Sequence, residues 1–204
     1  AGVDPTRREE ILALLTGCGV LVRPRSPRSR WGFAGRNFER EVAAAGAHES
    51  VLDRPNACVW VRSRGSTAAT VAAVLLQAGV GRVERDAPGG DSMRYRARPD
   101  LVVLTAAEPV AVDAGSHWLE RGIPHLPVAL TGGGASVGPL VLPGLGPCLG
   151  CLERVRAELD PSWTWLRAQL GAPPDPASAL AEGECALTTI AAGLAARLVL
   201  AHLD

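Results

Sequence analysis

The sequence predicts an α/β fold of the Rossmann-like type, with a mostly parallel sheet and helices on both of its faces. Short apolar runs alternate with longer Ala- and Leu-rich runs of helical length between residues 57 and 130. Fully apolar strands alternating with helices are typical of a parallel sheet that is buried on both sides. The 204 residues are 47% hydrophobic and 21% charged, which is a globular composition and excludes a mainly disordered chain.

Before the sheet, the sequence predicts one helix, one short strand and a cationic linker. Asp4 can cap the helix, Pro5 suits its first position and Gly17 can end it. The expected strand covers residues 20–22, and five arginines make residues 23–36 cationic. This linker is interpreted as a solvated loop, with a surface for an acidic peptide as the alternative. The apolar face of the helix would consist of Ile11, Leu12, Leu14 and Leu15.

The remaining segments supply the sheet and the helices that cover it. Strands are expected at residues 57–61, 81–84, 101–104 and 125–130, and helices at residues 68–78 and 109–120. These are followed by a strand pair around residues 137–142, helical residues 152–170 interrupted at Asp160-Pro161, a loop at 172–183, and a buried helix at 186–203. The predicted organisation is therefore an N-terminal α+β segment at residues 1–48 and a Rossmann-type domain at residues 49–204.

The charge pattern excludes several classes of function. Lys+Arg and Asp+Glu each number 21, and this neutral balance is not that of a dedicated nucleic-acid binder. No lysine occurs, so a Walker lysine, a Schiff base and a lysine general base are all excluded. The sequence also shows no uninterrupted apolar run of about 18 residues and no apolar signal core at its start. No membrane association is expected, and the predicted location is the cytoplasm.

The turn after the first sheet strand is the first candidate site. A strand, a turn of small residues and a helix N-terminus together can bind a nucleotide phosphate through free amides and the helix dipole. This turn contains a single glycine, and its arginines would either crowd the phosphates or bind an anion themselves. The candidate residues are Arg62, Arg64, Gly65, Ser66 and Thr67.

The second candidate site is the C-x-x-C pair formed by Cys148 and Cys151. Such a pair can supply two thiolates to a tetrahedral zinc ion, and a redox dithiol is the alternative. Five cysteines are an odd number, which fits a reducing compartment better than a disulfide framework. Structural zinc needs four ligands, so a half-site is as reasonable as a complete one. Further ligands could come from Cys185, His117, His125 or His202.

The third feature is a pair of tryptophans, Trp163 and Trp165, in an otherwise polar predicted helix. Residues two apart cannot share one helical face. Core packing is the simpler interpretation, and a dimer interface is the alternative, because tryptophan is enriched at interfaces.

Several of these segments resemble the ThiF/MoeB-type, ubiquitin-activating-like family. The similar parts are residues 59–86, residues 101–104, Gly122-Ile123-Pro124, the PC-x-x-C segment within residues 139–151, and the apolar closing helix from Cys185. Together the resemblance covers about residues 55–204. Within the family, the chain is most similar to actinobacterial precursor-peptide-binding proteins of azoline-peptide (bacteriocin) cyclodehydratase systems. In those proteins a winged-helix-like peptide-binding region precedes the ThiF-like domain, and residues 1–48 resemble a remnant of it.

The departures from the family pattern concern its ATP chemistry. Three of the four glycine positions of the G-x-G-G-x-G motif hold Arg62, Arg64 and Thr67. The magnesium-holding aspartate corresponds to about Ala107, the phosphate-contacting lysine has no counterpart, and the second cysteine pair is missing. By resemblance, Asp86 joins the turn residues as a candidate cofactor contact. Without this combination of cations and metal, phosphoryl chemistry is not expected.

The resemblance therefore implies a degenerate ThiF-like scaffold that binds its ligand without catalysing a reaction. It implies a homodimer that binds a precursor or leader peptide and presents it to a YcaO-type modifying enzyme, with structural zinc at Cys148 and Cys151 and no use of ATP or magnesium. The alternative is an active ATP-dependent adenylyltransferase that activates a carboxylate of a small protein or peptide. In that case Arg62, Arg64, Gly65 and Ser66 would replace the usual phosphate cradle.

Overall fold

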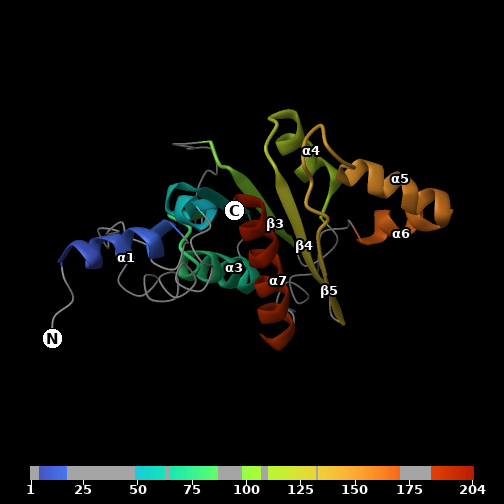
Figure 1. Cartoon of the computed structure of the whole chain (residues 1–204). Coiled ribbons are helices and arrows are strands. Elements are labelled where there is room, and N and C mark those ends of the chain that lie inside the picture. Colours follow the sequence, from blue (N-terminus) through green and yellow to red (C-terminus); the bar gives the residue numbers. More distant parts are fainter. Residues whose placement is uncertain are drawn as a thin grey trace.

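The computed structural model describes residues 5–17, 49–62, 65–86, 98–106, 110–131, 133–170 and 185–204. Helices and strands alternate along most of these residues (Figure 1). In chain order they are α1 (Pro5–Gly17), η1 (Glu49–Asn56), β1 (Cys58–Arg62), α3 (Ser66–Gln77), β2 (Arg82–Arg85), β3 (Leu101–Ala106), α4 (Val112–Glu120), β4 (His125–Thr131), β5 (Gly134–Val137), α5 (Leu149–Leu159), α6 (Trp163–Leu170) and α7 (Cys185–Leu203).

The five strands form one sheet in the order β2-β1-β3-β4-β5. The first four strands are parallel, and β5 pairs antiparallel with β4. The predicted Rossmann-like α/β fold with a mostly parallel sheet is thus confirmed. The chain places β2 on one side of β1 and β3 on the other, so the strand order reverses at β1. In open α/β sheets, such a reversal creates a crevice at the carboxyl ends of the two central strands.

One face of the sheet is covered by α3 and α7, which lie side by side (Figure 1). Alternate residues of the strands point to this face, including Val59, Leu101 and Leu126, all fully buried. The two helices meet them mainly through alanine, valine and leucine. Alanine is small, so the helix backbones can approach the sheet and each other closely. The alanines of this core are Ala68, Ala72, Ala191, Ala192, Ala195 and Ala196.

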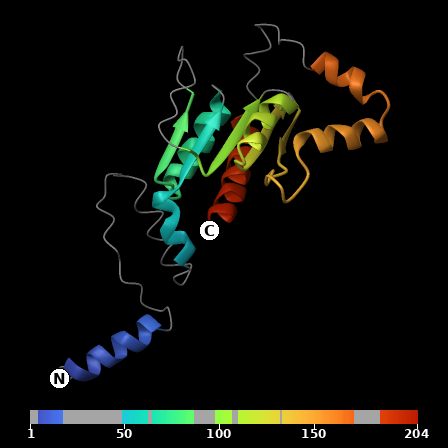
Figure 2. The ribbon, with the colours of Figure 1, turned by 90° about the horizontal axis from the view of Figure 1, so that it is seen from above.

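The opposite face carries a smaller apolar cluster beneath α4. Trp60 from β1 and Trp118 from α4 meet edge to face, with ring centroids 5.8 Å apart. Cys58, Val102, Leu104 and Ile123 complete the buried part of this cluster. The helices α5 and α6 follow and project to one side of the sheet in both views (Figures 1 and 2).

An ion pair ties η1 to the end of α7. The Arg54 guanidinium donates from Nε and Nη2 to both carboxylate oxygens of Asp204, at 2.7 and 2.6 Å, and from Nη1 to the Ala78 carbonyl oxygen at 3.2 Å. The Arg54 side chain is only 7% exposed. The turn before β2 packs against the same segment so closely that a Cβ on Gly81 would lie 1.7 Å from the Pro55 carbonyl oxygen. The 3₁₀ helix η1 was not predicted from the sequence.

The predicted helices and strands of the sheet are confirmed to within a few residues, with one exception. The strand pair expected around residues 137–142 is instead β5 at Gly134–Val137, followed by a single bridge between His125 and Val141. A cis peptide precedes Pro139, and Gly138 has a positive φ of 95°, so the chain turns there. The predicted strand at 20–22, the linker at 23–36 and the loop at 172–183 lie outside the described residues.

The two terminal helices are less buried than expected. The helix α1 is present as predicted, but Ile11, Leu12 and Leu14 on its apolar side are exposed, and Figure 2 shows it apart from the sheet. The closing helix α7 is long and apolar enough to cross a membrane by length and composition alone. It packs on β4, β5 and α3, which makes it a core helix on one side, while Ile190 and Leu194 are exposed on the other.

Candidate functional site

The crevice at the strand reversal brings together the ends of β1, β2 and β3. Arg62 is the last residue of β1, and Asp86 directly follows β2. Thr105 lies near the end of β3, and its hydroxyl oxygen is 3.5 Å from the Arg62 carbonyl oxygen. The structure therefore gathers two of the predicted site residues, Arg62 and Asp86, at the position where this class of fold binds ligands.

Arg62 and Asp86 form an ion pair across the carboxyl ends of β1 and β2. The Arg62 Nη1 atom lies 2.9 Å from the Asp86 Oδ1 atom, and their side chains are 23% and 19% exposed. By resemblance, Arg62 stands at a glycine position of the nucleotide-binding turn. A guanidinium at this point occupies space that a glycine would leave open, and it engages the carboxylate expected to contact the cofactor.

The helix α3 begins beside this ion pair. Gly65 is its N-cap residue with an extended backbone, and no side chain caps the helix. The Ser66 carbonyl oxygen accepts a hydrogen bond from the Thr70 hydroxyl at 2.9 Å. Ser66 and Thr67 are half-buried in the first turn of α3, and the N-terminal end of a helix carries a partial positive charge. Arg64 lies outside the described residues, as does the position near Ala107.

A second polar contact joins His117 of α4 to Arg121, the C-cap residue of that helix. The Arg121 Nη1 atom donates a hydrogen bond to His117 Nδ1 at 2.8 Å. Partial desolvation, followed by the positive charges of Arg121 and Arg62, lowers the pKa of His117, against the opposing effect of Glu120. Arg62 at the end of β1 thus contributes to lowering the pKa of a histidine on α4.

The C-x-x-C pair lies at the start of α5, where Cys148 is the N-cap residue. The two sulfur atoms are 3.6 Å apart. Hydrogen bonds from the backbone and side chain of Cys151 lower the pKa of the Cys148 thiol. With zinc–sulfur bonds of about 2.3 Å, two thiolates of a tetrahedral site lie about 3.8 Å apart, so the pair has the spacing of half a zinc site.

The other predicted zinc ligands do not join this pair. Within the described part of the chain, no three His, Cys, Asp or Glu side chains gather closely enough to hold a metal ion. His125 is fully buried, its Nδ1 atom lies 3.2 Å from the Ile123 carbonyl oxygen, and burial lowers its pKa. Cys185 starts α7, and His202 lies near the end of the same helix. The zinc prediction itself stays untested.

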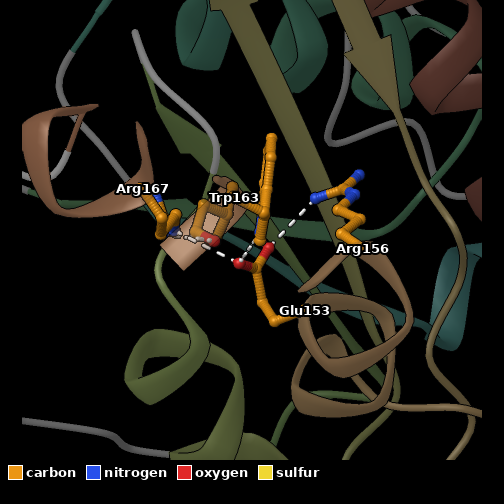
Figure 3. Close-up of polar contacts among 5 residues, drawn as sticks. Glu153, Arg156, Trp163 and Arg167 are labelled. Atoms are coloured by element: carbon orange, nitrogen blue, oxygen red, sulfur yellow. Dashed lines mark hydrogen bonds and ion pairs between the residues drawn. The ribbon is translucent and has the colours of Figure 1, made fainter. Parts of the chain in front are cut away.

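A cluster that sequence reasoning did not single out lies between α5 and α6, and we call it the α5–α6 cluster (Figure 3). Its members are Glu153, Arg156, Trp163 and Arg167. The indole Nε1 atom of Trp163 donates to Glu153 Oε2 at 2.7 Å, and Arg156 Nη1 lies 3.0 Å from Glu153 Oε1. Arg167 Nε lies 3.6 Å from Glu153 Oε2, and the Arg156 guanidinium stands 5.2 Å from the centre of the Trp163 ring.

One signal in the sequence could have indicated part of this cluster. Glu153 and Arg156 are three residues apart, the spacing at which side chains meet on a helix. Trp163 and Arg167 are brought in only by the turn at Asp160-Pro161. The simpler interpretation of the two tryptophans is wrong for Trp165, which is 66% exposed, whereas Trp163 is half-buried in a polar cluster.

Comparison with solved structures first defines the class of fold. Forty solved chains match, and they include structures of MccB and of a heterocyclase. No protein-family model and no curated protein matches the sequence.

Two of the matching proteins are Escherichia coli MccB and a heterocyclase. The match to MccB has a TM-score of 0.59 at 13% identity and covers 100% of this chain and 71% of that one. MccB in complex with N-formylated MccA, where it is described as the microcin C7 biosynthetic enzyme, gives a TM-score of 0.59 at 13% identity over 73% of its length. A heterocyclase in complex with substrate and cofactor gives 0.60 at 17% identity, and this chain spans 26% of its length. At these identities the comparisons establish a shared fold.

Proposed function

We propose that this protein is a degenerate ThiF-like scaffold that binds a precursor peptide and presents it to a separate modifying enzyme. The fold is shared with MccB, which has been solved with N-formylated MccA, and with a heterocyclase, which has been solved with substrate and cofactor. The sequence resemblance assigns the partner to the YcaO-type modifying enzymes of ribosomal peptide maturation. In this proposal the chain contributes binding and positioning, and its partner contributes the chemistry.

The Arg62–Asp86 ion pair is the observation that supports this proposal most directly. The ion pair lies in the crevice where related folds bind nucleotides. In it, Arg62 neutralises Asp86, the acidic residue predicted to contact the cofactor. No lysine is available elsewhere in the sequence to compensate. Phosphoryl transfer depends on positioned cations and metal, and the residues that the structure describes at this crevice include a neutral pair, Arg62 and Asp86.

A pyrophosphate-exchange assay with Mg-ATP, combined with a thermal shift, tests the proposal. The wild-type protein is expected to show neither exchange nor stabilisation. The variant Arg62→Gly, which opens the crevice and frees Asp86, serves as the matched control for nucleotide access. Clear stabilisation together with exchange in the wild-type protein would overturn the scaffold proposal.

Binding is tested with the short peptides encoded next to the gene, each labelled and titrated against the purified protein. The proposal expects one of them to bind and to become a better substrate for a co-expressed modifying enzyme when this chain is present. If no encoded peptide binds, the scaffold function fails independently of the nucleotide result.

An active adenylyltransferase is the second candidate function. The observation in its favour is the uncapped N-terminus of α3 at the crevice, with Gly65 and Ser66 in place for an anion. Under this alternative, Arg62 would leave Asp86 when ATP binds and would contact the phosphates. Wild-type exchange that is lost in Arg62→Ala would support this alternative.

Zinc at Cys148 and Cys151 is part of the proposal. The sulfur spacing of 3.6 Å fits one half of a tetrahedral site, and the lowered pKa of Cys148 favours the thiolate that zinc needs. The other two ligands would come from outside the described residues or from another chain. Elemental analysis of the purified protein tests this: less than about 0.2 zinc per chain, with both thiols freely reactive, excludes a stable site.

We further propose that the protein is a homodimer in the cytoplasm that pairs through the exposed side of α7. Ile190 and Leu194 are 69% and 51% exposed on a helix whose other side is core. Light scattering after size exclusion tests the dimer, with Leu194→Arg expected to give a monomer. A wild-type protein that is monomeric at micromolar concentration would contradict it.

A further inference from the structure

A cleft opens between the outer edge of the sheet and the α5–α6 pair. The described residues leave a volume of about 340 Å³ there, which we call the edge cleft. Its floor is formed by β4 and β5, and its wall by α5 and by Trp163 of α6. Figure 1 shows α5 and α6 projecting beside β4 and β5, and α7 lies on the opposite face of these strands.

Small side chains on the sheet create the floor of the cleft. Leu126, Val128 and Leu130 point into the core beneath α7, so Pro127 and Ala129 point to the opposite face. Ser136 is the register partner of Ala129 and shares that face. Gly134 and Gly138 add no side chain at all. The space therefore follows from the sequence of β4 and β5, where larger residues would have filled it.

The wall of the cleft combines an apolar surface with charge. Leu149 and Leu152 contribute the apolar part, and Glu153, Arg156 and Trp163 of the α5–α6 cluster contribute the polar part. One carboxylate, on Glu153, faces the two guanidiniums of Arg156 and Arg167, which leaves one positive charge. Arg156 is 45% exposed, so a ligand can reach it, and Figure 3 shows it on the opposite side of Glu153 from Arg167.

The strand β5 adds a third property. It pairs with β4 on one side and is the last strand of the sheet among the described residues. Its residues Gly134, Ala135 and Ser136 line the cleft. An edge strand is a template on which an extended peptide can add, with main-chain hydrogen bonds for affinity and an adjacent pocket for alternate side chains.

From these three properties we propose that the edge cleft binds an extended peptide segment in which an apolar side chain lies next to an acidic residue. The apolar side chain occupies the cleft over Ala129 and Leu152, the acidic residue pairs with Arg156, and the peptide backbone aligns with β5. This inference rests on the proposed peptide-binding function and assigns it a surface. The surface is separate from the crevice that holds Arg62 and Asp86.

The test uses a fluorescein-labelled short peptide with a central Phe-Asp pair, measured by fluorescence anisotropy on the full chain. Ser136→Phe fills the cleft and is expected to weaken binding about tenfold or more, because the phenylalanine loses its buried position. Val155→Phe, on an exposed part of α5 that does not line the cleft, is the matched control and should leave binding unchanged. Circular dichroism confirms that each variant is folded.

A charge exchange tests the assigned role of Arg156. Arg156→Glu should weaken binding of the Phe-Asp peptide and strengthen binding of a Phe-Lys peptide. A merely structural role of Arg156 would not produce this reversal. Arg154→Glu on the same helix, outside the cleft lining, should do neither. Equal effects of the two substitutions, or no binding of the Phe-Asp peptide to the wild-type protein, would overturn the inference.

The same variants separate this inference from the function on which it rests. If a peptide encoded beside the gene binds the wild-type and Ser136→Phe proteins equally, the edge cleft is not the binding surface, and the scaffold function stands. If the Phe-Asp peptide binds in the cleft and no encoded peptide binds, the scaffold function fails while the cleft remains a peptide site.

Discussion

The two faces of the sheet are packed differently. Beneath α3 and α7, small and medium apolar residues fit together closely, with Val59, Leu75 and Leu126 fully buried. The opposite face relies on the Trp60–Trp118 pair near its centre and leaves the edge cleft over β4 and β5. The comparison indicates that the α3–α7 face holds the fold together, whereas the other face has room for a ligand. Substitutions in the α3–α7 face should therefore lower the free energy of unfolding more than substitutions in the opposite face.

The largest loss of stability is expected at Gly81, where the surrounding backbone leaves no space for a side chain. Gly81→Ala should destabilise the protein by about 4 kcal/mol or more, because the new Cβ would overlap the backbone of Pro55 and the chain must shift. Gly133→Ala is the matched control, since a Cβ there meets no atom within 4 Å. Urea unfolding measures both. Similar stabilities for the two variants would contradict the close contact of η1 with the turn before β2.

Cavity-forming substitutions compare the two faces directly. Leu75→Ala, in the α3–α7 core, should cost about 3 kcal/mol, because it removes buried methyl groups and leaves a void. Leu152→Ala, which only lines the edge cleft, should cost about 1 kcal/mol. Both values come from chemical denaturation monitored by tryptophan fluorescence. If Leu152→Ala costs as much as Leu75→Ala, the edge cleft is part of a packed core.

Removing the Arg54 side chain should cost about 2 to 3 kcal/mol, because it leaves the carboxylate of Asp204 and the Ala78 carbonyl without their partner. The estimate lies at the lower end of the range for buried pairs, since Asp204 is 23% exposed. Arg54→Lys should recover part of the loss, because lysine retains the charge without the paired geometry. A thermal melt in which Arg54→Ala matches the wild-type protein would show that this ion pair does not stabilise η1 on α7.

The smallest effect concerns pH and the buried His125. Burial lowers its pKa below the ordinary value of about 6.5, so the folded protein resists protonation that the unfolded chain accepts. Stability is complete above that ordinary value and should fall as the pH drops below it. His125→Gln should flatten the dependence of unfolding free energy on pH between about 5 and 7, and His117→Gln should flatten it less, because His117 is less buried. An unchanged slope in His125→Gln would exclude this residue as its source.

Sequence patterns predicted β1, β3 and β4 well, because each of these strands is a short, mostly apolar run between breaks. They failed where the structure depends on contacts between distant residues. The 3₁₀ helix η1 is short and mostly polar, and it is held by Arg54 through Asp204, which is 150 residues away. The C-x-x-C pair was expected before a helix starting at residue 152, but α5 begins at Leu149 and Cys148 caps it.

The candidate sites also contain some residues that local sequence order identifies and others that only tertiary contacts bring together. The turn residues Arg62, Gly65 and Ser66 were identified from the strand–turn–helix order, which is local. That Arg62 pairs with Asp86 depends on β2 lying beside β1, and the parallel order of these strands is a tertiary property. The α5–α6 cluster was missed because only Glu153 and Arg156 have a recognisable spacing. Trp163 and Arg167 join them through the turn between the two helices.

By itself, the sequence determined the α/β class, the order of the elements and the absence of lysine chemistry, because these follow from composition and local periodicity. Only the tertiary structure decided which residues meet. It placed the Arg62–Asp86 pair in the crevice, left the zinc candidates as a pair of thiols within the described residues, and opened the edge cleft. The physical reason is that side-chain contacts between neighbouring strands and helices depend on strand order and helix placement, which no local pattern specifies.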